Sequence, residues 1–317
     1  MNRPRPRAWV CGGPCLWALL ACTGPARAGD APPVEREPAL DMPGGELRIE
    51  LPEAAPARRR MLQAWVDEVA AGIPATFGRW PLQRAWVRIV EIDSRDRSPV
   101  PWGQTKRGGA SPGVLLYVRR DAGLAELRAD WTATHEFAHL FHPYLGREGR
   151  WLAEGLASYY QNVVRARAGT MAPREAWRAL DAGFRRGERE TVDGPLASAG
   201  RGETMRVYWA GAAFWLEADL ALRRRGQHLD QVLADHAACC LATAPPRDPA
   251  AFVAALDRVA GTSVLAPLYR RHAAARSFPA LAGSYATLGL RREGDALRFD
   301  AAGREARTAI MGSDAAR

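Results

Sequence analysis

The segment HEFAH, from His135 to His139, combines residue types and a spacing that suit metal chemistry. Residues four apart lie on the same face of a helix, so both imidazoles can meet one ion. Glu136 then lies beside that ion, where it can take a proton from water and pass it to a leaving amine. A zinc ion lowers the pKa of bound water and polarises a carbonyl. The pattern therefore predicts hydrolysis of a peptide bond by metal-activated water. Zinc is the expected metal, and a different divalent ion in the cell remains an alternative.

A surface helix that carries two histidines without a metal is the alternative for this segment. A helix destined for the core does not normally bury two histidines and a glutamate without a partner. Apolar neighbours indicate that this helix is such a core helix: Trp131, Ala133, Phe137, Ala138 and Leu140.

A catalytic zinc needs a third protein ligand and an open fourth position. His142 lies seven residues beyond His135, about 10 Å along a helix, which is too far to share an ion. A ligand at position 145, as in HExxHxxGxxH, is excluded because that residue is Leu145. Glu154 remains, in the segment WLAEGLASYY near the start of a second helix. The intervening turn carries Pro143, Gly146 and Gly149.

HEFAH and WLAEGLASYY together resemble the gluzincin metallopeptidases, especially relatives of aminopeptidase N and the glycyl aminopeptidase group. In that family the glutamate of W-x-x-E-G-x-A is the third zinc ligand, so the resemblance implies His135, His139 and Glu154 as the ligands. The segment YWAGA, which starts at Tyr208, is similar to the family's Y-x-K-G-A. The tyrosine of that segment stabilises the oxyanion of the tetrahedral intermediate, a role implied here for Tyr208. The resemblance covers roughly residues 114–290 and implies a thermolysin-like fold.

Some features depart from the family pattern. Only 14 residues separate His139 from Glu154, which is short for the family, and Ala210 replaces the lysine of the tyrosine segment. The loop before Val114 lacks the G-x-M-E-N motif, whose glutamate grips the free amine in aminopeptidase N relatives. Cleavage at the N-terminus and cleavage inside a chain therefore both stay open. Rival oxyanion donors are His228 and His236, and two tyrosines are expected to pack in the core: Tyr159 and Tyr160.

The first 28 residues are typical of an export signal. They have a basic start, an apolar stretch too short to span a bilayer, and a small-x-small site that ends at Ala28. A second cleavage site competes, because Leu19 to Cys22 resembles a lipobox that would lipidate Cys22. The sequence thus predicts an exported protein, either a soluble periplasmic or secreted form or an outer-membrane-anchored lipoprotein.

Charge and cysteine content exclude other classes. The formal net charge is +9, and four of the contributing arginines lie in the signal segment, so the rest of the chain carries +5. That part of the chain shows no alternation of aromatic and basic residues. Nucleic-acid binding is therefore not expected. Outside the signal segment only Cys239 and Cys240 remain. Adjacent cysteines rarely pair, so we expect two buried thiols on a helix and no disulfide framework.

Hydrophobic spacing predicts the elements that must position the site. Residues 98–113, with three prolines and four glycines, predict a long loop beside the active site. Strands are predicted at 46–51, 85–92 and 114–118, and helices at 58–73, 125–141, 150–167, 205–225, 229–242 and 249–260. The tail from 288 to 309 predicts a strand, a turn at 300–303 and another strand.

A strand-rich part followed by helices, joined near residue 121, argues for an α+β fold. We expect a small β-sheet subdomain followed by a helical lobe, with the cleft between them. The predicted order is a signal peptide at 1–28, a flexible linker at 29–45, a β-rich subdomain at 46–120, a helical zinc peptidase domain at 121–290 and a β-hairpin-like tail at 291–317.

Two other functions stay open at this point. The chain could be a catalytically inactive exported binding or envelope protein that retains the peptidase fold, or a membrane-tethered scaffold with a structural zinc. Retention of Glu136 argues against both, because an inactive protein would be free to lose it and a closed metal site does not need a general base. The expected partner is a peptide or protein substrate, and the oligomeric state stays undetermined.

Overall fold

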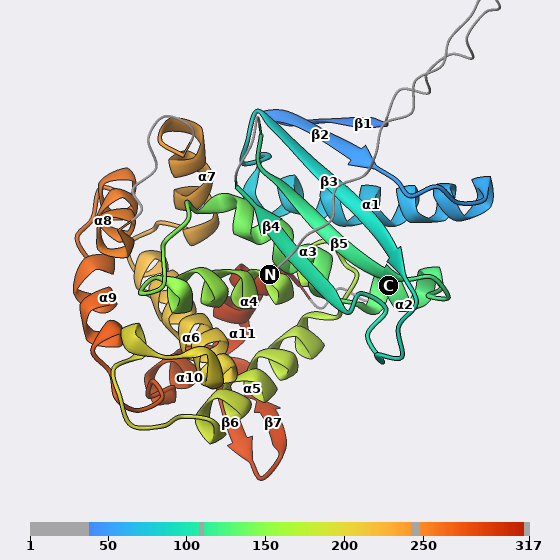
Figure 1. Ribbon diagram of the computed structural model, residues 1–317. Coiled ribbons are helices and arrows are strands. Elements are labelled where there is room, and N and C mark those ends of the chain that lie inside the picture. The colour runs from blue at the N-terminus through green and yellow to red at the C-terminus, as the bar shows by residue number, and fades with distance from the viewer. Residues whose placement is uncertain (1–37, 108–110, 242–247, 314–317) are drawn as a thin grey trace, which may run out of the picture. The chain divides into compact units, whose positions relative to one another are not determined.

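A five-stranded mixed sheet forms the first part of the computed structural model, which describes residues 38–107, 111–241 and 248–313 (Figure 1). The strand order is β1-β2-β3-β5-β4. The three central strands run parallel and both edge strands are antiparallel to their neighbours. The strands are β1 (Ala39–Met42), β2 (Gly45–Glu50), β3 (Arg84–Ile92), β4 (Trp102–Lys106) and β5 (Gly113–Arg119).

Helix α1 (Pro56–Phe77) is the crossover that parallel pairing of β2 with β3 requires. It extends past Pro74, where the sequence predicted an end near residue 73. A proline in the last turn removes only one backbone donor, and the helix ends instead at Gly78, whose φ of 74° is favourable for glycine.

Strand β4 lies inside the segment that was predicted to be a long loop, so that prediction was wrong for residues 102–106. It pairs with β5 through Gly103 opposite Leu116 and Thr105 opposite Val114. Because β4 is the last strand of the sheet, no strand in the described ranges pairs with its other edge, and β4 lies beside the helix of the HEFAH segment.

The single helix predicted at 125–141 is divided into α2 (Leu124–Ala129), α3 (Thr132–Ala138) and the 3₁₀ turn η1 (His139–Phe141). The break occurs at Asp130, whose carboxylate accepts a hydrogen bond of 2.7 Å from the Thr132 backbone N–H. Such local capping by an aspartate competes with a continuous helix and starts a new one. All seven residues of α3 are buried.

Helices α4 (Arg150–Arg167) and α6 (Thr204–Arg223) pack against each other in the centre of the helical part, below the sheet in Figure 1. Trp215 is fully buried between them and donates from Nε1 to the carbonyl oxygen of Leu152 (2.8 Å). The helix predicted at 150–167 is confirmed. The other helices are α5 (Pro173–Arg189), α7 (Leu229–Cys239), α8 (Pro249–Val259), α9 (Leu265–Ala273), α10 (Ala282–Leu288) and α11 (Arg304–Met311).

The predicted tail was partly wrong. A hairpin of β6 (Leu290–Glu293) and β7 (Ala296–Phe299) turns at Gly294 and Asp295, a glycine-containing two-residue turn. The chain after residue 303 forms α11 where a second strand was predicted, because Ala306 and Ile310 are spaced four residues apart on a buried face.

Two further predictions need correction. Residues 39–42 of the predicted flexible linker form strand β1, which pairs with β2. Cys239 and Cys240 form a disulfide at the end of α7, and Cys239 is exposed where buried thiols were predicted. The helix stops at Cys239 and Cys240 leaves the helical conformation, which frees the two side chains from their helical directions.

Strand β5, the last strand of the sheet along the chain, ends at Arg119, and α2 begins at Leu124. The predicted signal segment and Cys22 lie outside the described residues, as does residue 242 at the end of the helix predicted at 229–242. None of the helices in the described ranges is both long and apolar enough to span a bilayer.

Candidate metal centre and active-site cleft

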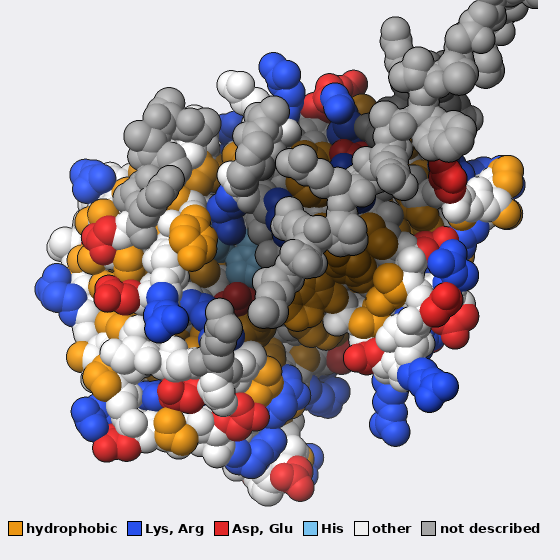
Figure 2. All heavy atoms as spheres, viewed as in Figure 1, with side chains coloured by type: hydrophobic (Ala, Val, Ile, Leu, Met, Phe, Trp, Pro, Cys, Tyr) orange, Lys and Arg blue, Asp and Glu red, His pale blue; other side chains and the backbone are white. Residues whose placement is uncertain are grey.

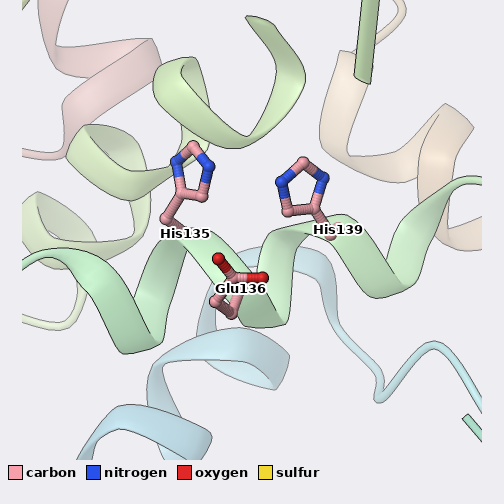
Figure 3. Close-up of side chains that lie close together, drawn as sticks. All are labelled: His135, Glu136 and His139. Carbon is pink, nitrogen blue, oxygen red and sulfur yellow. The ribbon is translucent and has the colours of Figure 1, made fainter. Parts of the chain in front are cut away.

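Two imidazoles project from one side of α3, with the carboxylate of Glu136 beside them (Figure 3). Ligand atoms of His135, Glu136 and His139 all lie within 4.8 Å of one another. Each histidine is buried, as the core helix requires. The four-residue spacing thus brings both rings to one place, although the helix that carries them becomes a 3₁₀ turn at His139.

Glu154, in the first turns of α4, brings a third potential metal ligand close to His135 and His139. Its Oε2 lies 3.3 Å from Nε2 of His135 and 3.5 Å from Nε2 of His139. Tetrahedral zinc with bonds of about 2.0–2.1 Å places its ligand atoms about 3.3–3.4 Å apart. The donor set of two imidazoles and one carboxylate fits a zinc ion in both chemistry and spacing.

Glu136 is also close to both histidines, but its carboxylate has another partner. The Thr105 hydroxyl lies 2.8 Å from Oε2 of Glu136 and 2.9 Å from its carbonyl oxygen. Thr105 comes from β4, which passes directly over this turn of α3. A Cβ on Gly103, two residues earlier, would lie 2.7 Å from Cγ of Glu136, so the strand can approach this closely only with glycine there. Glu154 is therefore the better candidate for the third ligand, because its carboxylate approaches both histidines and that of Glu136 contacts Thr105.

Both histidines have their second ring nitrogen fixed. His135 donates from Nδ1 to Oε1 of Gln161 (2.9 Å). The Nδ1 of His142 lies 2.7 Å from the Pro143 carbonyl oxygen and must donate to it, so Nε2 of His142 accepts the 2.8 Å bond from Nδ1 of His139. These bonds leave Nε2 of each ligand histidine free for a metal, a support that metal-binding histidines commonly need.

Glu154 and the two histidines also interact electrostatically. Burial opposes ionisation of Glu154, but hydrogen bonds from His135 and His139 outweigh it and hold the pKa of Glu154 below its usual value. Burial alone would lower the pKa of His135, but the bond to Glu154 and the charges of Glu136 and Glu154 raise it. Burial and the charges of Arg107 and His139 lower the pKa of His142, which keeps that ring neutral.

Tyr208, from α6, lies against the same cluster. Its ring stacks on His135 with centroids 5.6 Å apart and an interplanar angle of 11°. Burial, the charge of Glu154 and a hydrogen bond to Glu154 raise the pKa of Tyr208 above its ordinary value. The phenol therefore stays protonated and can donate.

The cluster lies in a cleft of about 1170 Å³ that β4 and the start of α4 border. A histidine is visible at the floor of the hollow on the face drawn in Figure 2. All five residues that the sequence marked as site residues line this cleft: His135, Glu136, His139, Glu154 and Tyr208.

The rival candidates lie elsewhere. His228 is exposed beside Arg223, and His236 is fully buried against Phe252. Neither is among the residues that line the cleft. Tyr159 and Tyr160 are buried, as expected for packing residues. The hydroxyl of Tyr159 donates to Oδ2 of Asp219 (2.8 Å), which gives it a structural partner.

The sequence did not reveal three partners of the site residues. Thr105, His142 and Gln161 each contact a ligand or the base, and only His142 was considered, as a ligand. Gln161 lies seven residues after Glu154 on α4, two helical turns along the same face, which is a spacing that could have marked it. Thr105 carries no comparable local signal.

No protein-family model matches the sequence, and no curated protein matches it. Solved structures do. An aminopeptidase N family protein from Idiomarina loihiensis has a TM-score of 0.57 at 13% identity, over 80% of this chain and 49% of that one. An M1 zinc metallopeptidase from Deinococcus radiodurans has a TM-score of 0.45 at 18% identity, over 77% and 52% of the two chains.

The chain thus spans about half the length of the solved structures that it matches. The expected architecture, a small sheet followed by a helical lobe, is present. At this level of identity the similarity concerns the fold alone. This chain therefore shares the fold of the Idiomarina loihiensis aminopeptidase N family protein.

Proposed function

We propose that the chain is a zinc-dependent peptidase that hydrolyses peptide bonds. The observation that carries this proposal is the approach of Glu154 Oε2 to Nε2 of both His135 and His139, at 3.3 and 3.5 Å, in a cleft that also holds Glu136 and Tyr208. When bound, zinc supplies Lewis acidity that activates water and polarises a carbonyl. Three protein ligands beside an open cleft are typical of catalytic zinc sites, whereas structural sites are closed.

Glu136 is the proposed general base. Its carboxylate lies beside the ligand set and is oriented by the Thr105 hydroxyl at 2.8 Å. From there Glu136 takes a proton from the attacking water and then delivers it to the departing amine, which would otherwise leave as an unstable anion. The bond from Thr105 uses one lone pair of one carboxylate oxygen and leaves the other oxygen available for the proton.

Tyr208 is the proposed oxyanion donor. Because its pKa is raised, its hydroxyl keeps the proton that a hydrogen bond to a developing negative charge needs. Stacking on His135 fixes the ring in advance, so little reorganisation is required when the charge forms.

A polypeptide is the proposed substrate. Trp102, Trp131 and Tyr144 are three of the four large hydrophobic side chains that are exposed in the described part of the chain, and all three line the cleft. Exposed aromatic residues of this kind are typical anchors for polypeptide side chains. The unpaired edge of β4 offers backbone donors and acceptors to an extended peptide in the same cleft.

Metal analysis and peptide digestion test this proposal together. The purified chain is expected to hold about one zinc, and Glu154→Gln should lose most of it, because one of three ligands is gone. Digestion of a defined peptide mixture, followed by mass spectrometry, should give products with the wild type and none with Glu136→Gln. Zinc without hydrolysis would support an inactive binding or envelope protein, and no zinc after its addition would overturn the metal site.

We also propose that the chain is exported, on the basis of its first 28 residues. A lipoprotein should incorporate radiolabelled palmitate through Cys22 and lose the label in Cys22→Ser. A soluble exported form should instead appear unlabelled in the periplasmic fraction, with a mature N-terminus at Gly29. Unprocessed protein in the cytoplasm would contradict both forms.

A further inference from the structure

The charged side chains that line the cleft are unevenly distributed. They comprise two carboxylates, Glu136 and Glu154, and three guanidinium groups, Arg107, Arg147 and Arg150. Both carboxylates are already engaged, Glu136 by Thr105 and Glu154 by the two ligand histidines. No other acidic residue is among the described residues that line the cleft, so the charges left for a substrate are positive.

Arg107 is committed to the architecture of the site. Its Nη2 donates to the carbonyl oxygen of His139 (2.6 Å) and its Nε to that of His142 (3.3 Å). Burial lowers the pKa of Arg107 to about 10, against the opposing charges of Glu136 and Glu154, so it remains a cation at neutral pH. It therefore compensates the carboxylates of the metal centre and holds the η1 turn.

Arg147 and Arg150 are differently placed. The side chain of Arg147 is exposed, and its guanidinium group has neither a hydrogen bond nor an ion pair with any residue that the structure describes. Within the described residues, the guanidinium group of Arg150 contacts the carbonyl oxygen of Gly200 (3.3 Å) and the hydroxyl of Thr204 (3.4 Å) but no carboxylate. Arg150 nevertheless lines the same cleft as Glu154 and Tyr208.

Several other arginines of the fold do have carboxylate partners, unlike these two. Arg292, for example, contacts both Asp181 and Glu188, and Arg276 forms two bonds with Asp193. A guanidinium group has five N–H donors in a planar fork that matches a carboxylate. Two such groups three residues apart, beside the same cleft, leave a set of donors without an anion.

We propose that Arg147 and Arg150 bind a carboxylate of the substrate, so that the cleft selects peptides with an anionic group near the scissile bond. This inference rests on the proposed peptidase function and gives its substrate class. A free α-amine would require a carboxylate acceptor, and the two carboxylates that line the cleft already have other proposed roles, Glu154 as a zinc ligand and Glu136 as the general base. The substrate carboxylate has two sources, the C-terminus of a peptide or an aspartate or glutamate side chain.

Binding to the zinc-loaded Glu136→Gln variant tests the inference without hydrolysis. One neutral peptide is compared in four forms: unmodified, with an amidated C-terminus, with an acetylated N-terminus, and amidated with one glutamine replaced by glutamate. If the terminus is the anchor, amidation should weaken binding at least about tenfold. If a side chain is the anchor, the glutamate should strengthen binding of the amidated peptide by a similar factor. Acetylation should have little effect in either case.

In the double variant Arg147→Gln with Arg150→Gln, the ratio of the affinities for the carboxylate-bearing and the neutral peptide should fall close to one. Arg224→Gln, an exposed charge at the end of α6 outside the cleft lining, is the matched control and should retain the preference. Zinc content and the far-ultraviolet circular dichroism spectrum establish that the double variant is folded and loaded.

The inference would be overturned if the acid and amide forms bound equally and glutamate gave no gain, or if no form bound. Weaker binding on acetylation, or an unchanged preference in the double variant, would also overturn it. A carboxylate preference without cleavage by the wild type would contradict the proposed peptidase function and leave the inference intact. Cleavage without the preference would contradict the inference alone.

Discussion

Gly155 of α4 and Gly211 of α6 lie in direct contact where the two helices cross. A Cβ on Gly211 would lie 2.0 Å from the carbonyl oxygen of Trp151, and one on Gly155 would lie 2.3 Å from the carbonyl carbon of Gly211. Gly155 follows Glu154, the proposed third ligand, and Gly211 is three residues after Tyr208. The close crossing thus sets how near the phenol comes to the metal ligands.

Gly211→Ala is expected to destabilise the chain and to impair the site together. The added methyl group has no room, so the helices must separate, at a cost of about 1–3 kcal/mol in the free energy of unfolding. Separation would move Tyr208 away from Glu154 and lower kcat on any peptide substrate. Urea unfolding and peptide kinetics measure the two effects.

Gly283→Ala is the matched control, since a Cβ there meets nothing within 4 Å. This residue lies in α10, where alanine has the higher helix propensity, so the control should be neutral or slightly stabilising. A neutral effect of Gly211→Ala on both stability and kcat would show that the crossing does not position Tyr208.

The parts of the site that follow helical periodicity could be predicted from the sequence. His135 and His139 are four apart on a helix, and Glu154 and Tyr208 lie in helices whose apolar spacing was clear. The helix at Arg150–Arg167 was predicted with its observed bounds because the turn before it and its apolar face are local features.

The parts that depend on tertiary contact could not be predicted. Thr105 reaches Glu136 across 31 residues of sequence, in a strand whose alternation is obscured by Gly103 and by the prolines on either side. Similarly, the break at Asp130 depends on a single contact, the hydrogen bond that its carboxylate accepts from the Thr132 backbone N–H. This bond competes with a continuous helix. Neither feature has a periodic signal, so both were found only once the fold was known.

Thr105→Val should lower kcat with little change in zinc content. The substitution removes the hydroxyl that orients Glu136 but keeps a β-branched side chain of similar size in β4. Loss of a positioning hydrogen bond to a general base is expected to reduce kcat by roughly tenfold. Thr287→Val is the control, because its hydroxyl donates only to Gly283 within an exposed helix. An unchanged kcat would mean that Thr105 has no part in catalysis.

Gln161→Leu should weaken zinc binding. Without Oε1 of Gln161 the Nδ1–H of His135 loses its acceptor, and the ring is free to rotate or to change its tautomer. Loss of such an outer partner typically reduces metal affinity by about 10–100-fold. Competition with a chromophoric chelator measures the affinity, with Gln231→Leu on the exposed face of α7 as the control. Equal affinities of the variant and the wild type would contradict the proposed support of His135.

Asp181 is expected to set part of the pH dependence of stability. It is buried and accepts hydrogen bonds from Tyr285 (2.7 Å), Arg185 (2.9 Å) and Arg292 (2.5 Å). The bonds from Tyr285 and Arg292 join α10 and the β6–β7 hairpin to α5. Burial alone would raise the pKa of Asp181, but the bonds from Tyr285, Arg292 and Arg185 outweigh it and lower the pKa below 3.8. The folded state therefore prefers the ionised form.

A carboxylate with a lowered pKa stabilises the fold above the ordinary pKa and loses that contribution as the pH falls through the folded value. Asp181→Asn should thus lower the free energy of unfolding by about 2–3 kcal/mol near pH 7. This difference from the wild type should persist to about pH 5 and shrink below the ordinary value of 3.8. Asp295→Asn, in the exposed hairpin turn, should show no such difference. Because acid releases zinc, the metal-free forms are compared by urea unfolding. A difference that stays constant down to the acid transition would contradict an ionised Asp181 as the link between α5 and the hairpin.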